Sequence, residues 1–447
     1  MAAATLPLVR GFTAGAAFAY RNGAAVSIET FLHDVAALAE TLPQRRHVLN
    51  LCTDRYRFAV GFAAALVRGQ IALLPPNETA DVIARLASQY ADTYCLHDLE
   101  KAPNGLPAIS FPERLAPGSG AALVPHVPAA QIAAIVFTSG STGQPLPHPK
   151  TWGSLVGVAL AEIEILQLRR QPGLALVGTV PPQHVFGLEA TVLMVMQGGF
   201  AMHARRPFFP ADVRAGLAAL PRPRGLVIAP VHLRILLAEP EQLPPADFLL
   251  CATSPLSPQL AAQAEARFGA PLYEIYGCTE SGGIASRRTT ATSEWRAMTD
   301  VTLRTDGKQT WVKGGHVETE VALADVIELR GWGRFLLHGR TADLVNIAGK
   351  RTSLAHLNYH LNSIEGVHDG VFVVPEQDRD RVTRLAAYVV APSLSSEGLM
   401  SALRERIDGA FLPRPLHFVD ALPRNATGKL PREALDDFQA DLARKAG

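Results

Sequence analysis

The sequence contains few of the features that mark disulfide-stabilised, membrane-spanning or polyanion-binding proteins. Only four of its 447 residues are cysteines. They form no CxxC pair and have no histidine at ligand spacing, so neither a disulfide scaffold nor a structural zinc site is expected. No run approaches the roughly 18 consecutive apolar residues that a membrane-spanning helix needs. The 42 Lys and Arg residues are balanced by 41 Asp and Glu residues, which leaves no net field for holding a nucleic acid. The cysteines are Cys52, Cys95, Cys251 and Cys278.

What remains is the composition of a large globular chain. Hydrophobic residues make up 48% of the sequence and charged residues 19%, which supplies ample core and excludes long disordered stretches. Single hydrophobic cores stop growing near about 250 to 300 residues, so we expect at least two domains. The N-terminal segment lacks the ordered charged, apolar and cleavage-site regions of a secretory signal. We therefore expect a soluble, cytoplasmic protein.

Helix-like and strand-like segments alternate up to about residue 340. Several short apolar runs each end in Gly, Ser, Thr or Pro, as strands do when they leave a sheet. This alternation predicts βαβ units and a parallel sheet, with ligands bound beyond the carboxyl ends of the strands. The runs span residues 132–137, 225–229, 248–252 and 272–275.

The pattern changes twice toward the C-terminus. Between residues 287 and 337 the helix signal fades and short β-like pieces predict a small β subdomain. Beyond residue 342, helix-like and strand-like segments alternate over short distances, at 353–364, 370–374, 385–390, 395–409 and 416–419. The predicted fold class is α/β, with a large N-terminal domain at 1–340 and a small, mobile α+β domain at 341–447.

A segment after the first apolar run has the composition of a phosphate-binding loop. It holds four hydroxyl side chains and two glycines in six residues, and glycines let backbone N–H groups approach phosphate oxygens. Judged alone, an ordinary Gly/Ser surface turn is an equally good interpretation. The chain contains no Walker, GxGxxG or GxSxG motif. The segment is Thr138, Ser139, Gly140, Ser141, Thr142 and Gly143.

Four further motifs follow this loop. Together the five elements resemble the signatures of the adenylate-forming superfamily, which includes acyl-CoA synthetases, aryl-acid ligases, luciferase-like enzymes and the adenylation domains of peptide synthetases. They span about two-thirds of the chain, and agreement of all five by chance is far rarer than agreement of one. The four motifs are PPQHVFG at 181–187, YGCTE at 276–280, Asp325 fifteen positions before Arg340, and NATGK at 425–429.

The resemblance implies a two-step reaction. ATP activates a carboxylic acid as acyl-AMP with release of pyrophosphate, and the acyl group then passes to a thiol. The expected acceptor is the phosphopantetheine of an acyl carrier protein or of CoA. Because negative charge builds at the α-phosphate, catalysis should rest on positioning and cationic stabilisation, with Mg²⁺ bridging phosphate oxygens.

The resemblance also implies roles at the nucleotide site. Glu280 is the candidate Mg²⁺ ligand, although an isolated glutamate is usually a solvated surface charge. Tyr276 offers an aromatic face for adenine, although a lone tyrosine is more often in the core. Asp325 and Arg340 are assigned to the ribose hydroxyls, with a surface ion pair as the alternative. The remaining predicted nucleotide-binding residues are Ser254, Gly277 and Thr279.

Further roles concern the acid and the thiol. His184 is predicted to contact or gate the carboxylate, with a buried core histidine as the alternative. Lys429 is the predicted catalytic lysine, bridging the attacking carboxylate and the α-phosphate. The predicted acid pocket is His184, Val185, Phe186, Gly187, Gly277 and Cys278. The predicted thiol route is Gly349, Lys350 and Arg351, with a solvated loop as the alternative.

Three positions depart from the family pattern. Leu146 stands where the phosphate loop usually has lysine, so Lys150 is hypothesised to reach a phosphate instead. Ala342 stands where the hinge often has Asp or Lys. Val185 stands where amino-acid adenylation domains carry the aspartate that pairs with the substrate ammonium. An unpaired ammonium is costly to bury, so an aryl or fatty acid is favoured over an α-amino acid.

Four segments of the sequence resemble a narrower group of enzymes within this superfamily. TGQPLPHPKTWG, VPPQHVFGLE, YGCTESGG and NIAGKRTSLAHLN are similar to the short ligases of aryl-polyene and xanthomonadin-type pigment gene clusters, which implies an aromatic acid such as 4-hydroxybenzoate. The alternatives are a fatty or 3-hydroxyacyl ligase and, in another class, a non-catalytic nucleotide-binding or scaffold protein on the same fold.

Overall fold

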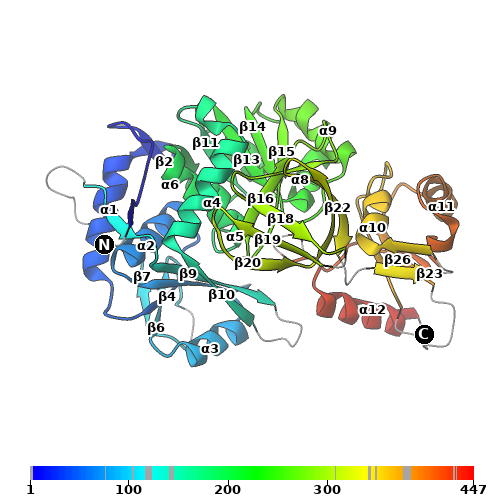
Figure 1. Cartoon of the computed structure of the whole chain (residues 1–447), viewed down its shortest axis with the longest axis horizontal. Helices are drawn as coiled ribbons and strands as arrows, with labels where there is room; N and C mark the ends of the chain where they lie inside the picture. Colours follow the sequence, from blue (N-terminus) through cyan, green and yellow to red (C-terminus); the bar gives the residue numbers. More distant parts are fainter. Residues whose placement is uncertain are drawn as a thin grey trace.

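The protein consists of a large α/β body and a smaller C-terminal unit beside it (Figure 1). This arrangement confirms the predicted fold class, whereas the domain boundary at residue 340 stays a prediction. The computed structural model describes residues 4–75, 77–102, 105–115, 123–139, 145–307, 309–340, 344–347, 350–375, 384–425, 428 and 430–446.

A six-stranded sheet forms the N-terminal part of the large body. Its order is β10-β9-β5-β4-β6-β7, and all neighbours are parallel except β9 and β10. Helix α2 (Arg55–Val67) is buried along almost its whole length, as a helix between packed layers must be. The other elements are β4 (His47–Asn50), β5 (Ile71–Leu74), β6 (Thr93–His97), β7 (Ala108–Ser110), β9 (Ile132–Ser139), β10 (Pro145–Thr151), α1 (Ile28–Thr41), α3 (Ala80–Gln89) and the pair β1 (Thr5–Pro7) and β8 (His126–Pro128).

An eleven-stranded sheet forms the centre of the large body, in the order β21-β22-β17-β16-β15-β14-β13-β11-β12-β2-β3. The run from β15 to β2 is parallel, which confirms the parallel sheet predicted from the βαβ alternation. Its strands are β2 (Ala17–Arg21), β11 (Ala175–Gly178), β12 (Ala201–His203), β13 (Arg224–Ile228), β14 (Phe248–Cys251) and β15 (Leu272–Cys278). Its helices are α4 (Trp152–Ile165), the 3₁₀ turn η1 (Leu168–Arg170), α5 (Val185–Leu188), the π-helix η2 (Glu189–Leu193), α6 (Met194–Gly198), α7 (Pro210–Ala218), α8 (Pro230–Ala238) and α9 (Pro258–Phe268).

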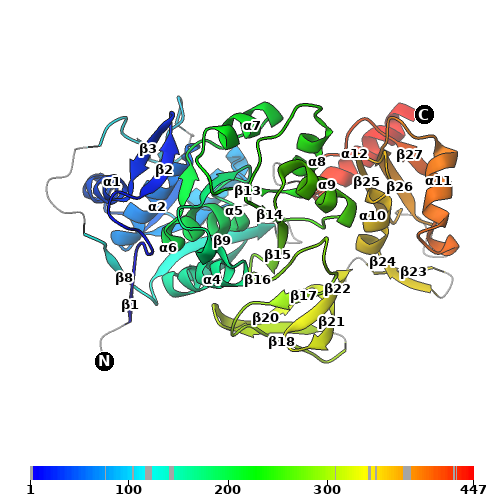
Figure 2. The ribbon, with the colours of Figure 1, turned by 90° about the horizontal axis from the view of Figure 1, so that it is seen from above.

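The predicted β subdomain is only partly separate from this sheet. Three of its strands, β18 (Thr302–Thr305), β19 (Thr310–Gly314) and β20 (Val317–Leu323), form a sheet of their own. The others extend the large sheet in antiparallel fashion, which the sequence did not predict. Figure 2 shows β17 to β22 as a lobe beside the body. The extending strands are β16 (Gly282–Arg287), β17 (Trp295–Ala297), β21 (Asp325–Gly331) and β22 (Arg334–Arg340), and β3 (Ala24–Ser27) lies at the opposite edge.

The C-terminal unit has the predicted sequence of short elements around its own hydrophobic core. A hairpin, β23 (Leu344–Ile347) and β24 (Lys350–Ser353), precedes a three-stranded sheet. The last helix was not predicted. The remaining elements are α10 (Leu354–Asn362), β25 (Asp369–Val373), β26 (Ala386–Val390), α11 (Ser396–Arg404), the 3₁₀ turn η4 (Gly409–Phe411), β27 (Leu416–Phe418) and α12 (Arg432–Ala446).

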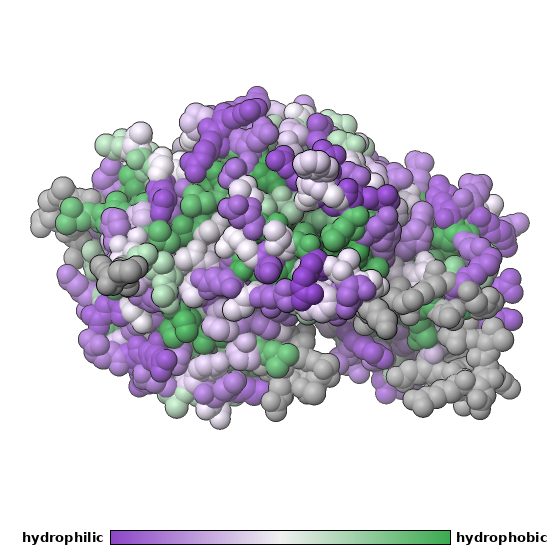
Figure 3. Space-filling model, in the orientation of Figure 1, coloured by the Kyte–Doolittle hydropathy of each residue, from purple (hydrophilic) through white to green (hydrophobic). Residues whose placement is uncertain are grey.

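On the face drawn in Figure 3, hydrophobic residues gather in several areas separated by hydrophilic ones. Among the described helices, none has both the length and the apolar character needed to cross a bilayer. All four cysteines are free thiols, and three of them are buried.

Candidate active site

Several predicted site residues lie at one edge of the eleven-stranded sheet. Strands β11, β13, β14 and β15 are adjacent and parallel, so the segments that follow them leave at the same edge. His184 follows β11, Ser254 follows β14 and Glu280 follows β15. The sheet topology therefore gathers motifs that are far apart in the sequence.

The loop that carries His184 is fixed from the six-stranded sheet. His184 is the N-cap residue directly before α5. The preceding Gln183 is buried, and its Nε2 donates to the carbonyl oxygens of Asn50 (3.4 Å) and Cys52 (3.2 Å) at the end of β4. The two sheets thus meet at this loop.

A buried arginine holds the same junction from α2. Arg55 has no exposed surface, and its Nη2 donates to the carbonyl oxygens of Gly178 (3.0 Å) and Val180 (2.7 Å), just before the PPQHVFG motif. Burial disfavours the charged guanidinium and lowers the pKa of Arg55 to about 9. The side chain therefore remains a cation at pH 7.

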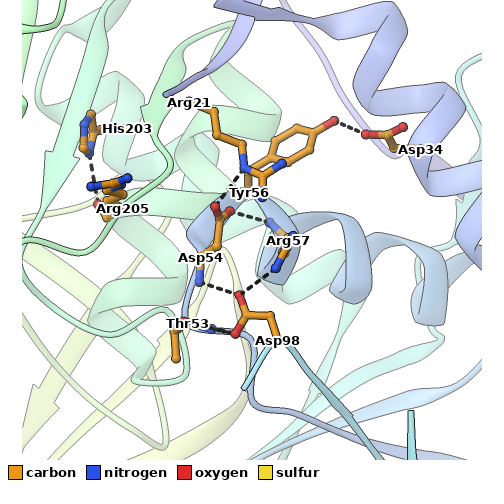
Figure 4. Close-up of polar contacts among 9 residues, drawn as sticks. All are labelled: Arg21, Asp34, Thr53, Asp54, Tyr56, Arg57, Asp98, His203 and Arg205. Carbon is orange, nitrogen blue, oxygen red and sulfur yellow. Dashed lines mark hydrogen bonds and ion pairs between the residues drawn. The ribbon is translucent and has the colours of Figure 1, made fainter. Parts of the chain in front are cut away.

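A group of paired charges fixes the start of α2 (Figure 4). Asp54 Oδ1 accepts from the backbone N–H of Arg57 (3.0 Å) as a helix cap, and Asp54 Oδ2 accepts from Arg21 Nε (2.9 Å). Asp98 accepts from the N–H groups of Thr53 (2.7 Å) and Asp54 (3.0 Å) and from the Thr53 hydroxyl (3.0 Å). We call these five residues the Asp54–Asp98 cluster.

Apart from His184, the residues of the predicted acid pocket are uncharged. Val185 and Cys278 are half-buried and contact the same hydrophobic core, and Phe186 is buried. Burial raises the pKa of Cys278 to about 11, so its thiol is neutral at pH 7. A Cβ at Gly187 or Gly277 would lie 1.9 or 2.1 Å from a carbonyl oxygen, so only glycine fits at these positions.

The structure brings together two of the residues assigned to the nucleoside. The Tyr276 hydroxyl donates to Asp325 Oδ2 (2.8 Å), and the tyrosine ring packs against Trp295 and Phe335, with centroid distances of 5.5 and 5.8 Å. Asp325 lies opposite Arg340 in the β21–β22 pair. Ser254 and Thr279 are half-buried in the loops after β14 and β15.

The turn after β15 places Glu280 beside the strand that follows the phosphate loop. Glu280 Oε1 lies 3.8 Å from His148 Nε2, which in turn is 3.0 Å from Thr138 Oγ1. Burial lowers the pKa of His148, so its imidazole is neutral at pH 7. Lys150 Nζ donates to the main-chain carbonyl of Glu280 (2.5 Å).

Three buried ionisable residues behind this turn were not predicted from the sequence. Glu162, Glu189 and His316 are 0%, 4% and 7% exposed. Burial raises the pKa of Glu189 to about 7, raises that of Glu162 and lowers that of His316 to about 4. For the two glutamates, the signal in the sequence was the presence of acidic residues inside apolar helical stretches. With Lys150 we call them the buried polar cluster.

The residues present fit a magnesium ion that is held mainly by the nucleotide. The Glu280 side chain is 38% exposed, and the described part of the chain gathers no group of three or more His, Cys, Asp or Glu side chains suited to a metal. Mg²⁺ commonly binds one or two carboxylates together with substrate phosphates and water. One accessible carboxylate at this sheet edge meets that requirement.

The C-terminal unit contacts the sheet edge close to the predicted lysine loop. A Cβ at Gly428 would lie 2.4 Å from Val231 Cγ1, and Val231 is the second residue of α8, directly after β13. Asp369 of β25 bonds to Arg424 (2.6 Å) and lies 3.6 Å from Arg234 of α8. These contacts place the residue next to position 429 at the carboxyl edge of the sheet.

The remaining predicted residues have no described contact with the sheet edge. Lys350 lies on β24, where its Nζ bonds to Asp408 Oδ2 (2.6 Å). Gly140, Ser141, Thr142, Gly143, Ala342, Gly349 and Lys429 lie outside the described residues, as do the side chains of Ser139, Arg340 and Arg351.

Comparison with known proteins agrees with this architecture. The sequence pattern of the family described as "AMP-binding enzyme" matches residues 39–326, and that of the "AMP-binding enzyme C-terminal domain" matches residues 361–429. 4-Coumarate–CoA ligase of Rhodobacter capsulatus is 29% identical over 300 residues, which are 66% of this chain and 74% of that protein. Indoleacetate–CoA ligase of Aromatoleum aromaticum is 26% identical over 352 residues, which cover 70% of this chain and 67% of that protein.

Solved structures share the fold over nearly the whole chain. ATP-bound MatB from Rhodopseudomonas palustris has a TM-score of 0.80 at 18% identity and covers 96% of both chains. O-succinylbenzoate CoA synthetase (MenE) from Bacillus subtilis, in complex with ATP and magnesium ion, has a TM-score of 0.80 at 19% identity and covers 95% of this chain and 97% of that chain. The chain therefore belongs to the AMP-binding enzymes, the adenylate-forming superfamily, and is an ATP-dependent, AMP-forming acid–thiol ligase.

Proposed function

We propose that this ligase activates an aromatic acid such as 4-hydroxybenzoate and transfers it to a phosphopantetheine thiol, on either an acyl carrier protein or CoA. The observation that carries the proposal is Val185, a half-buried uncharged side chain in contact with the core where an amino-acid-activating domain would need a carboxylate. The named relatives act on coumarate, indoleacetate and 2-succinylbenzoate, which are all aromatic acids.

The nucleotide half of the proposed site combines residues from four strands and the segments that follow them. Asp325, which already accepts a hydrogen bond from Tyr276, retains lone pairs for ribose hydroxyls, and Arg340 stands opposite it in the sheet. The Thr138–Gly143 loop is proposed to hold the phosphates through backbone N–H groups and hydroxyls. Glu280 would hold magnesium, which supplies positive charge to the phosphate oxygens when it is bound.

The acid half is proposed to lie between the His184 loop and the end of β15. His184 directly precedes α5, and its side chain is proposed to contact or gate the carboxylate. Lys429 would reach the carboxylate and the α-phosphate from the C-terminal unit, whose Gly428 already lies against α8. Its ammonium would hold the two reacting groups in line. For the second step, the Gly349 to Arg351 segment is proposed to face the thiol after a domain rotation.

An ATP–pyrophosphate exchange screen across aryl, fatty and amino acids tests the proposal. We expect exchange with hydroxybenzoates or similar aryl acids and none with proteinogenic amino acids. Robust exchange with an α-amino acid alone would refute the role given to Val185. Exchange with fatty or 3-hydroxyacyl acids alone would favour the corresponding ligase. Thioester formation with CoA, compared with a holo-carrier protein, then identifies the acceptor.

A further inference from the structure

The Glu280–Gly283 turn is held by two side chains from different elements. Lys150, on β10, donates to the Glu280 carbonyl (2.5 Å). Glu189, in the π-helix one turn after Val185, accepts from the Gly283 N–H (3.2 Å). Both side chains line the same small pocket, which opens to solvent and also includes Glu280 and Gly282. The turn is therefore hydrogen-bonded to side chains at both ends, at Glu280 by Lys150 and at Gly283 by Glu189.

The two glycines of the turn make room for buried carboxylates. A Cβ at Gly282 would lie 2.6 Å from Glu189 Oε1, and a Cβ at Gly283 would lie 2.8 Å from Glu162 Oε1. Gly282 also has a φ of +73°, which side chains with a Cβ rarely adopt. The Ser-Gly-Gly sequence after Glu280 is thus explained by the acidic groups packed behind it.

Burying the side chains of Glu162, Glu189 and Lys150 costs desolvation free energy. Taking a carboxylate or an ammonium out of water is unfavourable unless it is well paired. Burial raises the pKa of Glu189 and lowers that of Lys150. Within the described part of the chain, neither carboxylate oxygen of Glu162 has a hydrogen-bond partner. Polar groups buried at such a cost are typical of functional sites.

The register of β10 separates Lys150 from the position of the usual phosphate-loop lysine. Side chains alternate along a strand, so Leu146, His148 and Lys150 share one face of β10. Four residues of strand span roughly 13 Å. Lys150 therefore lies far along the strand from position 146, where the family usually has its lysine. Its ammonium instead donates to a main-chain carbonyl of the turn.

We propose that Lys150 and Glu189 are positioning residues that fix the Glu280–Gly283 turn and thereby aim the Glu280 carboxylate at the magnesium ion that accompanies ATP. This inference rests on the proposed function of Glu280. It competes with the sequence-based hypothesis that Lys150 contacts a phosphate directly, and the two make different predictions.

The experiment is calorimetric titration of ATP at a series of Mg²⁺ concentrations, without any acid. Lys150→Met and Glu189→Met remove the donor and the acceptor, whereas Lys150→Arg and Glu189→Gln retain them. Glu318→Gln is the matched control, because Glu318 lines the same pocket but accepts from the Thr151 hydroxyl (2.7 Å) instead of the turn. Each Met variant should raise the Mg²⁺ concentration for half-maximal ATP binding about tenfold, a size typical of residues that orient metal ligands.

The conservative, control and double variants distinguish a positioning role of Lys150 from a direct contact with phosphate. The conservative variants and the control should stay near wild type, and the double Met variant should be little worse than either single one. Equal weakening of ATP binding by Lys150→Met with Mg²⁺ and in EDTA would show a direct phosphate contact and overturn the proposal. So would the same Mg²⁺ shift in Glu318→Gln, or an unshifted, folded Glu189→Met.

Misfolding of a variant and failure of the proposed function can each be distinguished from failure of the positioning proposal. If a Met variant does not fold, the proposal is judged on the other Met variant, and a tenfold shift in both conservative variants would contradict it. Wild-type protein that does not bind MgATP would count against the proposed function itself. Normal MgATP binding without pyrophosphate exchange would count against the proposed acids and leave the Mg²⁺ shifts interpretable.

Discussion

The Asp54–Asp98 cluster and the buried polar cluster differ in how completely their ionisable groups are hydrogen-bonded. In the first, both aspartates accept several hydrogen bonds from the backbone and neighbouring side chains. In the second, Glu162 is fully buried with no partner for either oxygen within the described chain, and Glu189 and His316 have strongly shifted pKa values.

If the proposed function holds, the contrast separates groups that stabilise the fold from groups that serve the reaction. Satisfied polar groups at a helix start contribute stability and fix the loops that follow them. Unsatisfied buried groups oppose folding and persist where they serve a site. Variants in the first cluster should therefore lose stability, and variants around the Glu280 turn should lose activity.

The largest expected effect is at the turn itself. Glu280→Ala removes the accessible carboxylate proposed to hold magnesium and should slow adenylation by about 100-fold or more, because the charge on the phosphates is then less well stabilised. Pyrophosphate exchange measures the rate. The thermal unfolding midpoint should stay near wild type, and a rate within a few-fold of wild type would remove Glu280 from the site.

The second effect is on stability at the Asp54–Asp98 cluster. Asp98 is only 3% exposed, and Asp98→Ala leaves the Thr53 and Asp54 N–H groups without their acceptor, which should lower the free energy of unfolding by about 3 kcal/mol. Urea unfolding measures this loss. The rate per folded molecule should be retained. An unchanged stability with a reduced rate would reverse the distinction between the clusters.

The third prediction concerns pH and His316. Its pKa in the folded protein is about 4, below the ordinary value of about 6.5, so the fold favours the neutral ring. This stability is present above pH 6.5 and is lost as the pH falls toward 4. Between pH 7 and pH 5 the wild type should lose about 2 kcal/mol more than His316→Gln in urea unfolding. Equal losses would show that His316 is not buried in this way.

The smallest effect is expected at Glu162. Burial raises its pKa and so favours the neutral carboxyl. Glutamine has nearly the shape of that neutral form, so Glu162→Gln should change stability by less than about 1 kcal/mol at neutral pH. Stability contributed by a group with a raised pKa is lost as the pH increases through that pKa. The variant should therefore resist alkaline unfolding better than the wild type. Identical unfolding curves at high pH would contradict a raised pKa at Glu162.

The sequence predicted what depends on local pattern. Apolar runs that end in turn residues gave the strands at 225–229 and 248–252 nearly as they are observed, at Arg224–Ile228 and Phe248–Cys251. The family resemblance assigned Tyr276 to adenine and Asp325 to the ribose but predicted no bond between them. That hydrogen bond joins residues 49 positions apart, which no local pattern connects.

Tertiary structure decided the rest. Lys150, Glu162, Glu189 and His316 come from β10, α4, the π-helix and the β19–β20 turn, and only packing brings them together. The extension of the central sheet by the β21–β22 hairpin likewise depends on the pairing of β22 with β17, whose residues are about 40 positions away. Single-sequence patterns do not encode such a pairing.

Lys429→Ala, measured in both half-reactions, tests the central claim that this chain forms an acyl-adenylate and then transfers it. We predict that the folded variant makes no acyl-adenylate from acid and ATP, yet transfers the acyl group when it is given preformed acyl-adenylate and the acceptor thiol. Near-normal adenylation by the variant, or equal loss of both half-reactions, would contradict the account.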